Sequence, residues 1–121
     1  MSRTPDRTQR VADAIQRVVA KSIHDEIKDF DLRMVTVTRI DLARDFSEAI
    51  VRYSVLGDEA KKKECAEQLS KIASYLQRRI ADEIKIHHIP HLKFLFDPSI
   101  EEGFKLEKLF DEINRQRKQD E

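Results

Sequence analysis

The chain has few of the residues that build nucleotide-binding loops or covalent cross-links. Its 121 residues include two glycines, Gly57 and Gly103, one cysteine, Cys65, and no tryptophan. Phosphate-cradling loops need several glycines so that the backbone can approach the phosphates closely, and we therefore expect no such loop. A lone cysteine excludes an intrachain disulfide, and its helical spacing from Leu69 predicts a buried structural thiol.

Long apolar runs are also missing. No segment approaches the ~18 consecutive apolar residues that a membrane-spanning helix needs. The polar start, MSRTPDRTQR, lacks the apolar centre of a secretory signal. We therefore expect a cytoplasmic protein that makes no contact with a membrane.

A net charge is absent as well, because 23 basic residues balance 23 acidic ones. Nucleic-acid-binding domains are usually basic, so the total charge gives no support to a nucleic-acid partner. The charges are distributed less evenly along the chain. Through Phe96 there are 18 basic and 15 acidic residues, whereas from Asp97 onward there are 5 basic and 8 acidic residues. The excess negative charge therefore lies in the C-terminal part.

Apolar residues recur every three or four positions from about Asp6 to Ile27, which predicts an amphipathic helix. The segments 34–42 and 49–56 are rich in β-branched residues and predict two strands. Only the polar stretch 43–48 joins them, which is too short for a parallel crossover, so we expect an antiparallel hairpin. Arg52 and Ser54 should point away from the core.

Asp58 can cap a long helix that we expect to run to about Ile84. A bend between Ser70 and Ser74 is compatible with that length. Pro90 ends the helical pattern, and Leu92–Phe96 alternates as a third strand, which makes a parallel or mixed sheet possible. A capping box at Ser99–Glu102 predicts a short last helix with apolar residues on one side. These apolar residues are Ile100, Phe104, Leu106, Leu109, Phe110 and Ile113.

The expected elements form one α+β domain over residues 1–121, with a frayed tail from about 114 to 121. His87, His88 and His91 are the one group that resembles a metal site. Pro90 breaks the helix that would align them, and no nearby cysteine or glutamate completes the ligand set, so histidines in a polar turn are the favoured interpretation. No glycine-flanked nucleophile indicates acyl transfer. We expect no metal, no cofactor and no enzymatic activity.

Basic side chains on two predicted helices are the candidate RNA contacts. Lys71, Arg78 and Lys85 lie opposite the apolar stripe of the long helix, with Arg79 beside them, and Arg10 and Arg17 share the outer edge of the first helix. Phosphate binding is one explanation. The other is a solvated helix face, because acidic residues are interleaved among the basic ones of the long helix.

The order helix, strand, strand, long helix, strand is that of a type II KH domain, a common RNA-binding fold. The sequence also resembles the ribosome-binding factor A family over about residues 7–113. The resemblance is carried by the following segments: Arg10–Gln16, Met34–Thr38, Asp45–Ala49, Ser54–Asp58, Ile89–Phe94 and Asp97–Gly103.

The resemblance implies a KH-like factor that binds free small (30S) ribosomal subunits and 16S rRNA, and assists late assembly and processing of the 5′ end of that rRNA. It implies neither catalysis nor a small-molecule substrate, and we expect a monomer when the chain is free. Family members lack the GxxG loop of ordinary KH domains, as this chain does. They carry an Ala-x-Gly kink instead, which here aligns with Ile72, Ala73 and Ser74. The alternative is a protein-interaction module with incidental RNA contact.

Overall fold

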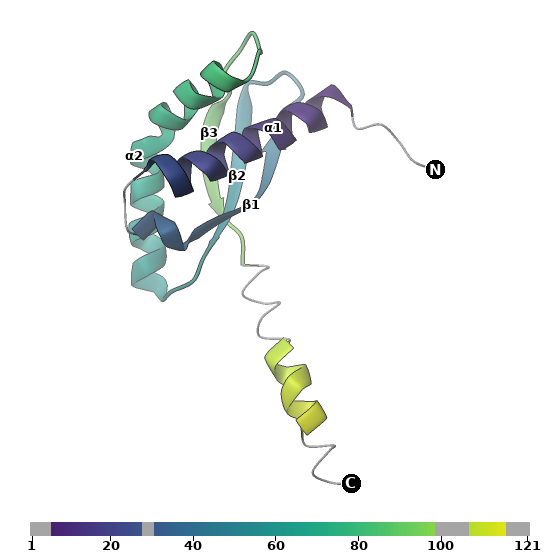
Figure 1. The fold of residues 1–121 in the computed structure, drawn as a ribbon, viewed down its shortest axis with the longest axis vertical. Coiled ribbons are helices and arrows are strands. Elements are labelled where there is room, and N and C mark those ends of the chain that lie inside the picture. Colours follow the sequence, from purple (N-terminus) through teal and green to yellow (C-terminus); the bar gives the residue numbers. More distant parts are fainter. Residues whose placement is uncertain (1–5, 28–30, 99–106, 116–121) are drawn as a thin grey trace.

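The fold is a three-stranded sheet with two long helices on one face (Figure 1). The computed structural model describes residues 6–27, 31–98 and 107–115. The elements, in chain order, are α1 (Arg7–Lys21), η1 (Ser22–Glu26), η2 (Asp31–Met34), β1 (Val35–Leu42), β2 (Glu48–Val55), α2 (Glu59–Glu83) and β3 (His91–Phe96). A further helix covers residues 107–115. The predicted α+β order of helix, strand, strand, long helix and strand is confirmed.

The strand order in the sheet is β1-β2-β3. β1 pairs antiparallel with β2, from Val35 opposite Val55 to Leu42 opposite Ala49, which confirms the predicted hairpin. β3 pairs parallel with β2, so the sheet is mixed. The long α2 makes this parallel return possible, because it carries the chain from the end of β2 back to the other end of the sheet.

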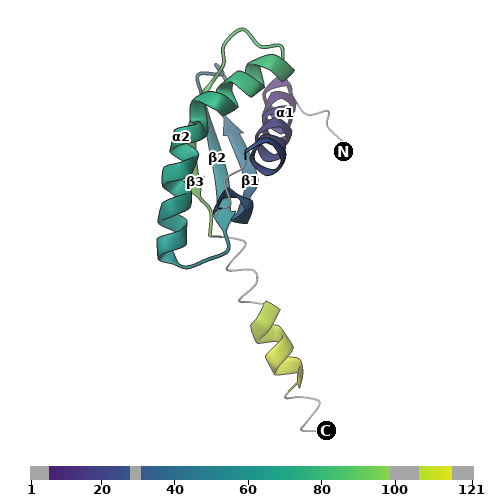
Figure 2. The ribbon, with the colours of Figure 1, turned by 60° about the vertical axis from the view of Figure 1, so that its left-hand side comes forward.

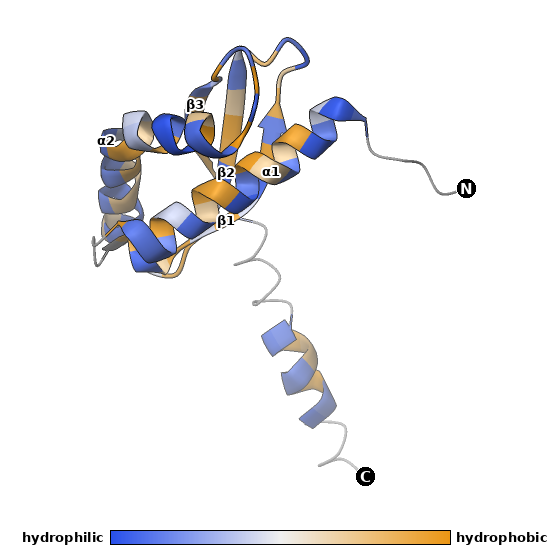
Figure 3. Cartoon of the chain, turned by 45° about the horizontal axis from the view of Figure 1, so that its top comes forward, coloured by the Kyte–Doolittle hydropathy of each residue, from blue (hydrophilic) through white to orange (hydrophobic). Residues whose placement is uncertain are grey.

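The core lies between the helices and the inner face of the sheet. The predicted inward residues of β2 are all buried, from Ala49 to Val55 at every second position. Ile15 and Val19 of α1 are fully buried, as are Cys65 and Leu76 of α2. Figure 3 shows the two-sided character of both helices, on which hydrophobic residues alternate with hydrophilic ones along the ribbon.

Both long helices begin where the sequence predicts. The Asp6 carboxylate accepts a hydrogen bond from the Gln9 N–H at 2.9 Å, and the Asp58 carboxylate accepts one from the Lys61 N–H at 2.9 Å. Each side chain thereby satisfies one of the free N–H groups of a first helical turn. The end of α1 differs from the prediction, because the helix widens into a π-helical turn over Ser22–Glu26.

α2 is one continuous helix that changes direction part-way along its length (Figure 2). Its first half covers the sheet, where Cys65 and Leu69 are buried, and its second half reaches the end of α1 through Tyr75 and Arg79. A bend, which the length of the helix allows, is therefore present in α2, although Ile72, Ala73 and Ser74 lack the glycine of the family pattern. It allows a single helix to contact both surfaces.

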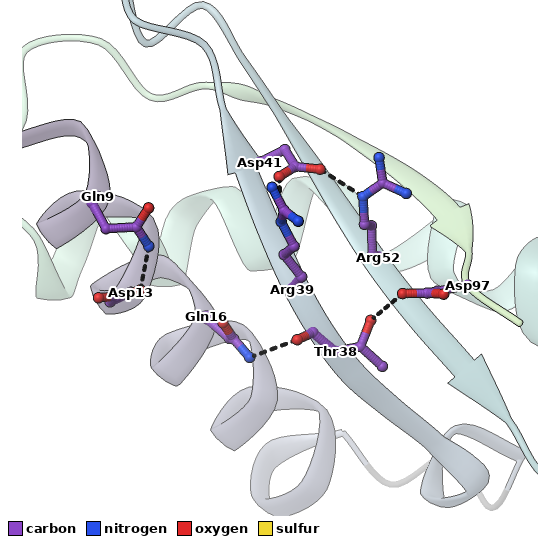
Figure 4. Close-up of polar contacts among 8 residues, drawn as sticks. All are labelled: Gln9, Asp13, Gln16, Thr38, Arg39, Asp41, Arg52 and Asp97. Atoms are coloured by element: carbon purple, nitrogen blue, oxygen red, sulfur yellow. Dashed lines mark hydrogen bonds and ion pairs between the residues drawn. The ribbon is translucent and has the colours of Figure 1, made fainter. Parts of the chain in front are cut away.

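The outer face of the sheet carries polar side chains. Asp41 of β1 lies between Arg39 and Arg52, at 2.6 Å from the Nε atom of each (Figure 4). The Thr38 hydroxyl donates to the Asp97 carboxylate at 3.1 Å, and this bond joins β1 to the end of β3 across β2. Ser54, which we expected to point away from the core, is only 4% exposed, even though its position in β2 alternates with the core residues.

The predicted last helix is confirmed for residues 107–115, all of which are exposed. Its apolar side chains are exposed too: Leu109 by 54%, Phe110 by 62% and Ile113 by 45%. The predicted capping box at 99–102 and the apolar residues Ile100, Phe104 and Leu106 lie outside the described residues. The expected frayed tail overlaps the described helix at 114–115, and its remainder also lies outside.

Candidate nucleic-acid interface

The predicted RNA contacts lie on the helical side of the molecule. Arg10 and Arg17 are exposed on α1, Lys71 and Arg78 are exposed on α2, and Lys85 is exposed two residues after α2 ends. Arg79 differs from them, because its side chain is only 26% exposed. Helical periodicity therefore predicted exposure correctly for five of the six residues.

A hollow of about 290 Å³ between the end of α1 and the second half of α2 brings Arg17 and Arg79 together. We call it the interhelical groove. Its lining residues are Ala14, Arg17, Val18, Lys21, Ser22, Glu26, Arg79, Glu83 and Ile84. Lys21 adds a third cation to this site, and its helical spacing from Arg17 was the signal in the sequence that could have placed it there.

Arg79 is held by three carboxylates within and beside this groove. Its Nε atom lies 3.0 Å from Glu26, its Nη1 atom 3.5 Å from Asp82 and its Nη2 atom 2.9 Å from Glu83. Glu26 also accepts a hydrogen bond from the Tyr75 hydroxyl. The network ties α2 to η1, and its carboxylates offset the positive charge of Arg79.

The same contacts shift the ionisation of the groups that make them. The hydrogen bond from Tyr75, followed by the charge of Arg79, lowers the pKa of Glu26 against the opposing effect of burial. The bond to Glu26 raises the pKa of Tyr75. Hydrogen bonds to Glu83 and then Glu26 raise the pKa of Arg79. Glu26 is therefore ionised at neutral pH, and its carboxylate is already bonded to Tyr75 and Arg79.

Four of the other predicted RNA-contacting residues have a positive charge that is not neutralised by an ion pair with a described residue. Arg17, Lys71, Arg78 and Lys85 form no ion pair with any residue that the structure describes. Such cations can bind phosphate without first breaking an internal contact. The charge accessible to a ligand on the helical side is thus carried by these residues more than by Arg79.

Sequence reasoning missed a second group of basic residues, at the end of the molecule where α1 begins. Two hollows lie there, and Arg7 and His87 line both of them. The first is also lined by Arg44, Phe46 and His88, and the second by Lys85. We call these six residues the Phe46 cluster. They come from three segments that are distant in sequence, so no local spacing could have grouped them.

The histidines considered as metal ligands are exposed at the connection after α2 and at the start of β3. Within residues 6–27, 31–98 and 107–115, no three or more histidine, cysteine, aspartate or glutamate side chains are grouped so as to hold a metal ion. None of the described helices is long and apolar enough to cross a membrane.

The fold and its surface define the class: a small α+β protein with a three-stranded mixed sheet that presents cations on its helical side. Comparison with known proteins identifies the family. Residues 7–110 match the family model of ribosome-binding factor A, and the chain belongs to that family. It is 41% identical over 112 residues to ribosome-binding factor A of Nitrosomonas europaea, covering 93% of this chain and 96% of that one. It is 38% identical over 114 residues to ribosome-binding factor A of Syntrophomonas wolfei, and the match covers 93% of each chain.

Solved structures agree on the fold. The crystal structure of ribosome-binding factor A from Thermus thermophilus matches with a TM-score of 0.65 at 23% identity, over 73% of this chain and 93% of that one. A Thermus thermophilus homology model, fitted into a cryo-EM map of a complex between the 30S subunit and ribosome-binding factor A, matches with a TM-score of 0.60 at 23% identity. It covers 72% of this chain and 91% of that one.

Proposed function

We propose that this chain is a maturation factor that binds the free 30S ribosomal subunit through 16S rRNA and assists late assembly, including processing of the 5′ end of the rRNA. Membership of the ribosome-binding factor A family carries the proposal. The Thermus thermophilus protein of the same fold is described in a complex with the 30S subunit, which supports the choice of partner. The chain acts as a single-domain monomer in the cytoplasm, and it catalyses no reaction.

The exposed cations of the helical side supply the means of binding. Lys71 and Arg78 on α2, Lys85 just after it, and Arg10 and Arg17 on α1 position the phosphate backbone. Arg79 contributes chiefly by holding α2 against η1, because its charge is already shared among three carboxylates. Affinity that depends on phosphate contacts falls steeply as salt concentration rises.

Co-sedimentation with purified 30S subunits tests the function and the residues separately. The variant Lys71→Glu/Arg78→Glu/Lys85→Glu should lose binding. The matched control Lys63→Glu/Lys108→Glu/Arg115→Glu changes the charge equally at other exposed positions and should retain it. Equal binding by both variants would reject the residue assignment, whereas a wild-type chain that does not sediment with 30S subunits would reject the function itself.

Processing of the rRNA needs a test in cells. Primer extension on 16S rRNA should show unprocessed 5′ ends accumulating when the gene for this chain is deleted, and the triple Glu variant should not restore normal ends. If that variant restored normal 5′ ends, processing would not depend on Lys71, Arg78 and Lys85. Light scattering of the purified chain measures its oligomeric state and should give the mass of one 14.2 kDa chain.

A protein-interaction role is the second candidate. The exposed apolar residues of helix 107–115 favour it, because such residues on one helix are suited to a protein groove. Nuclease treatment of a lysate before capture distinguishes the two. Under the leading proposal the main partners are released with the RNA, and partners that stay attached would favour the interaction module.

A further inference from the structure

Three segments that are remote in sequence meet at one end of the molecule. They are the start of α1, the turn between β1 and β2, and the connection from α2 to β3 (Figure 1). Two hollows of about 270 and 260 Å³ lie there and share Arg7 and His87 in their walls. The basic and aromatic residues that line these two hollows are the Phe46 cluster.

Phe46 occupies a fixed position in this surface. Its φ of 62° lies in the left-handed region, which a bulky side chain seldom adopts. Neighbouring bonds hold the turn: the Phe46 N–H donates to the Ala43 carbonyl at 2.9 Å, and Asp45 accepts from the Ser47 N–H at 3.0 Å and from its hydroxyl at 2.6 Å. The ring is only half-buried, and the Arg7 guanidinium carbon lies 5.5 Å from its centroid. The pair is thus held close together.

The charge around the ring is positive and is not neutralised by ion pairs with described residues. Arg7, Arg44 and Lys85 form no ion pair with a described residue, in contrast to Arg79 in the interhelical groove. Asp45 is the one carboxylate lining these two hollows in the described part of the chain, and the bonds from Ser47 occupy it. Asp6, next to Arg7, is engaged as the cap of α1.

We propose that the Phe46 cluster binds a single-stranded nucleotide of RNA. A base stacks on the Phe46–Arg7 pair, and the flanking phosphates contact Arg7, Arg44 and Lys85. An aromatic ring beside guanidinium groups suits an unpaired nucleotide, because bases stack on both kinds of plane and phosphates accept hydrogen bonds from the cations. The inference rests on the proposed RNA-binding function and assigns it a site separate from the interhelical groove.

The absence of tryptophan from this chain allows a direct test of stacking. The variant Phe46→Trp would contain the sole tryptophan, and its fluorescence should be quenched, to saturation, by a ten-nucleotide single-stranded RNA at low salt. An abasic oligonucleotide of equal length should bind more weakly and quench far less. The proposal would be overturned if the fluorescence stayed unchanged while the anisotropy of labelled RNA showed binding. It would also be overturned if oligo-glutamate quenched the fluorescence equally, because that result would indicate an acidic protein partner.

Variants that remove the positive charges or the aromatic ring measure how much this surface contributes to RNA affinity. Arg7→Gln/Arg44→Gln should weaken RNA binding about tenfold, and Phe46→Leu, which keeps an apolar side chain, should weaken it about fivefold, the lower end of the usual stacking contribution. Lys63→Gln/Lys108→Gln is the matched control, at two other exposed positions, and should bind as wild type does. Circular dichroism establishes that each variant is folded, and wild-type affinity of folded Arg7→Gln/Arg44→Gln would overturn the site.

These experiments separate the site from the function. If the wild-type chain sediments with 30S subunits and folded Arg7→Gln/Arg44→Gln binds RNA normally, the site is wrong and the function stands. If the wild-type chain binds neither 30S subunits nor RNA, the proposed function fails together with the site.

Discussion

α2 and the helix at 107–115 have the same kind of apolar spacing and different surroundings. In α2, Leu69, Leu76 and Ile80 are at most 1% exposed. In the later helix, Leu109, Phe110 and Ile113 are exposed by about half. Periodicity therefore predicts that a segment is helical and which side is apolar, whereas burial depends on whether another surface lies opposite that side.

The comparison is sharpest for a matched pair of leucines. Leu76→Ala should lower the free energy of unfolding by about 2–5 kcal/mol, because a fully buried leucine leaves a cavity when it is truncated. Leu109→Ala should leave it unchanged, since that side chain is exposed. Urea denaturation of both variants measures the difference, and equal effects would contradict the contrast between the two helices.

The start of α2 gives the next largest effect. Asp58→Ala removes the side-chain acceptor for the Lys61 N–H and should cost about 1 kcal/mol of stability. Asp58→Asn serves as the control, because asparagine caps about as well as aspartate and should restore most of the loss. A thermal unfolding series of the three proteins checks this, and an Ala variant as stable as wild type would show that the cap is dispensable.

The tie between α2 and η1 should make stability depend on pH. Bonds from Tyr75 and Arg79 lower the pKa of folded Glu26 below its ordinary value of 4.5, so its stabilising effect is complete above that pH and is lost as pH falls through the folded value. Glu26→Gln should therefore be less stable than wild type at pH 7, and this difference should disappear at an acidic pH below the folded pKa of Glu26. Denaturation at both pH values provides the measurement, and a constant difference would rule out this linkage.

Removing the exposed helix should have the smallest effect. A chain ending at residue 106 should unfold at the same temperature as the full chain, because every described residue of 107–115 is exposed. Differential scanning calorimetry compares the two. A clearly lower midpoint in the shortened chain would mean that this helix stabilises the domain and would remove the contrast with α2.

Much of the fold could be predicted from single segments. Alternation along β2, the short connection expected at 43–48 and the cap at Asp58 identified the hairpin and the long helix within a residue or two. The π-helical turn at Ser22–Glu26 and the burial of Ser54 could not be predicted in this way. Both depend on the surfaces that these residues meet, which local periodicity does not describe.

The sequence alone determined which residues form helices and strands, which side of each is apolar, and the family to which the chain is similar. These properties follow from local propensity and spacing along the backbone. Only the tertiary structure decided that Arg79 is held by Glu26 of η1, and that Arg7, Arg44 and Lys85 surround Phe46. The physical reason is that the charge available for binding depends on neighbours brought together by folding, and those neighbours are far apart in the chain.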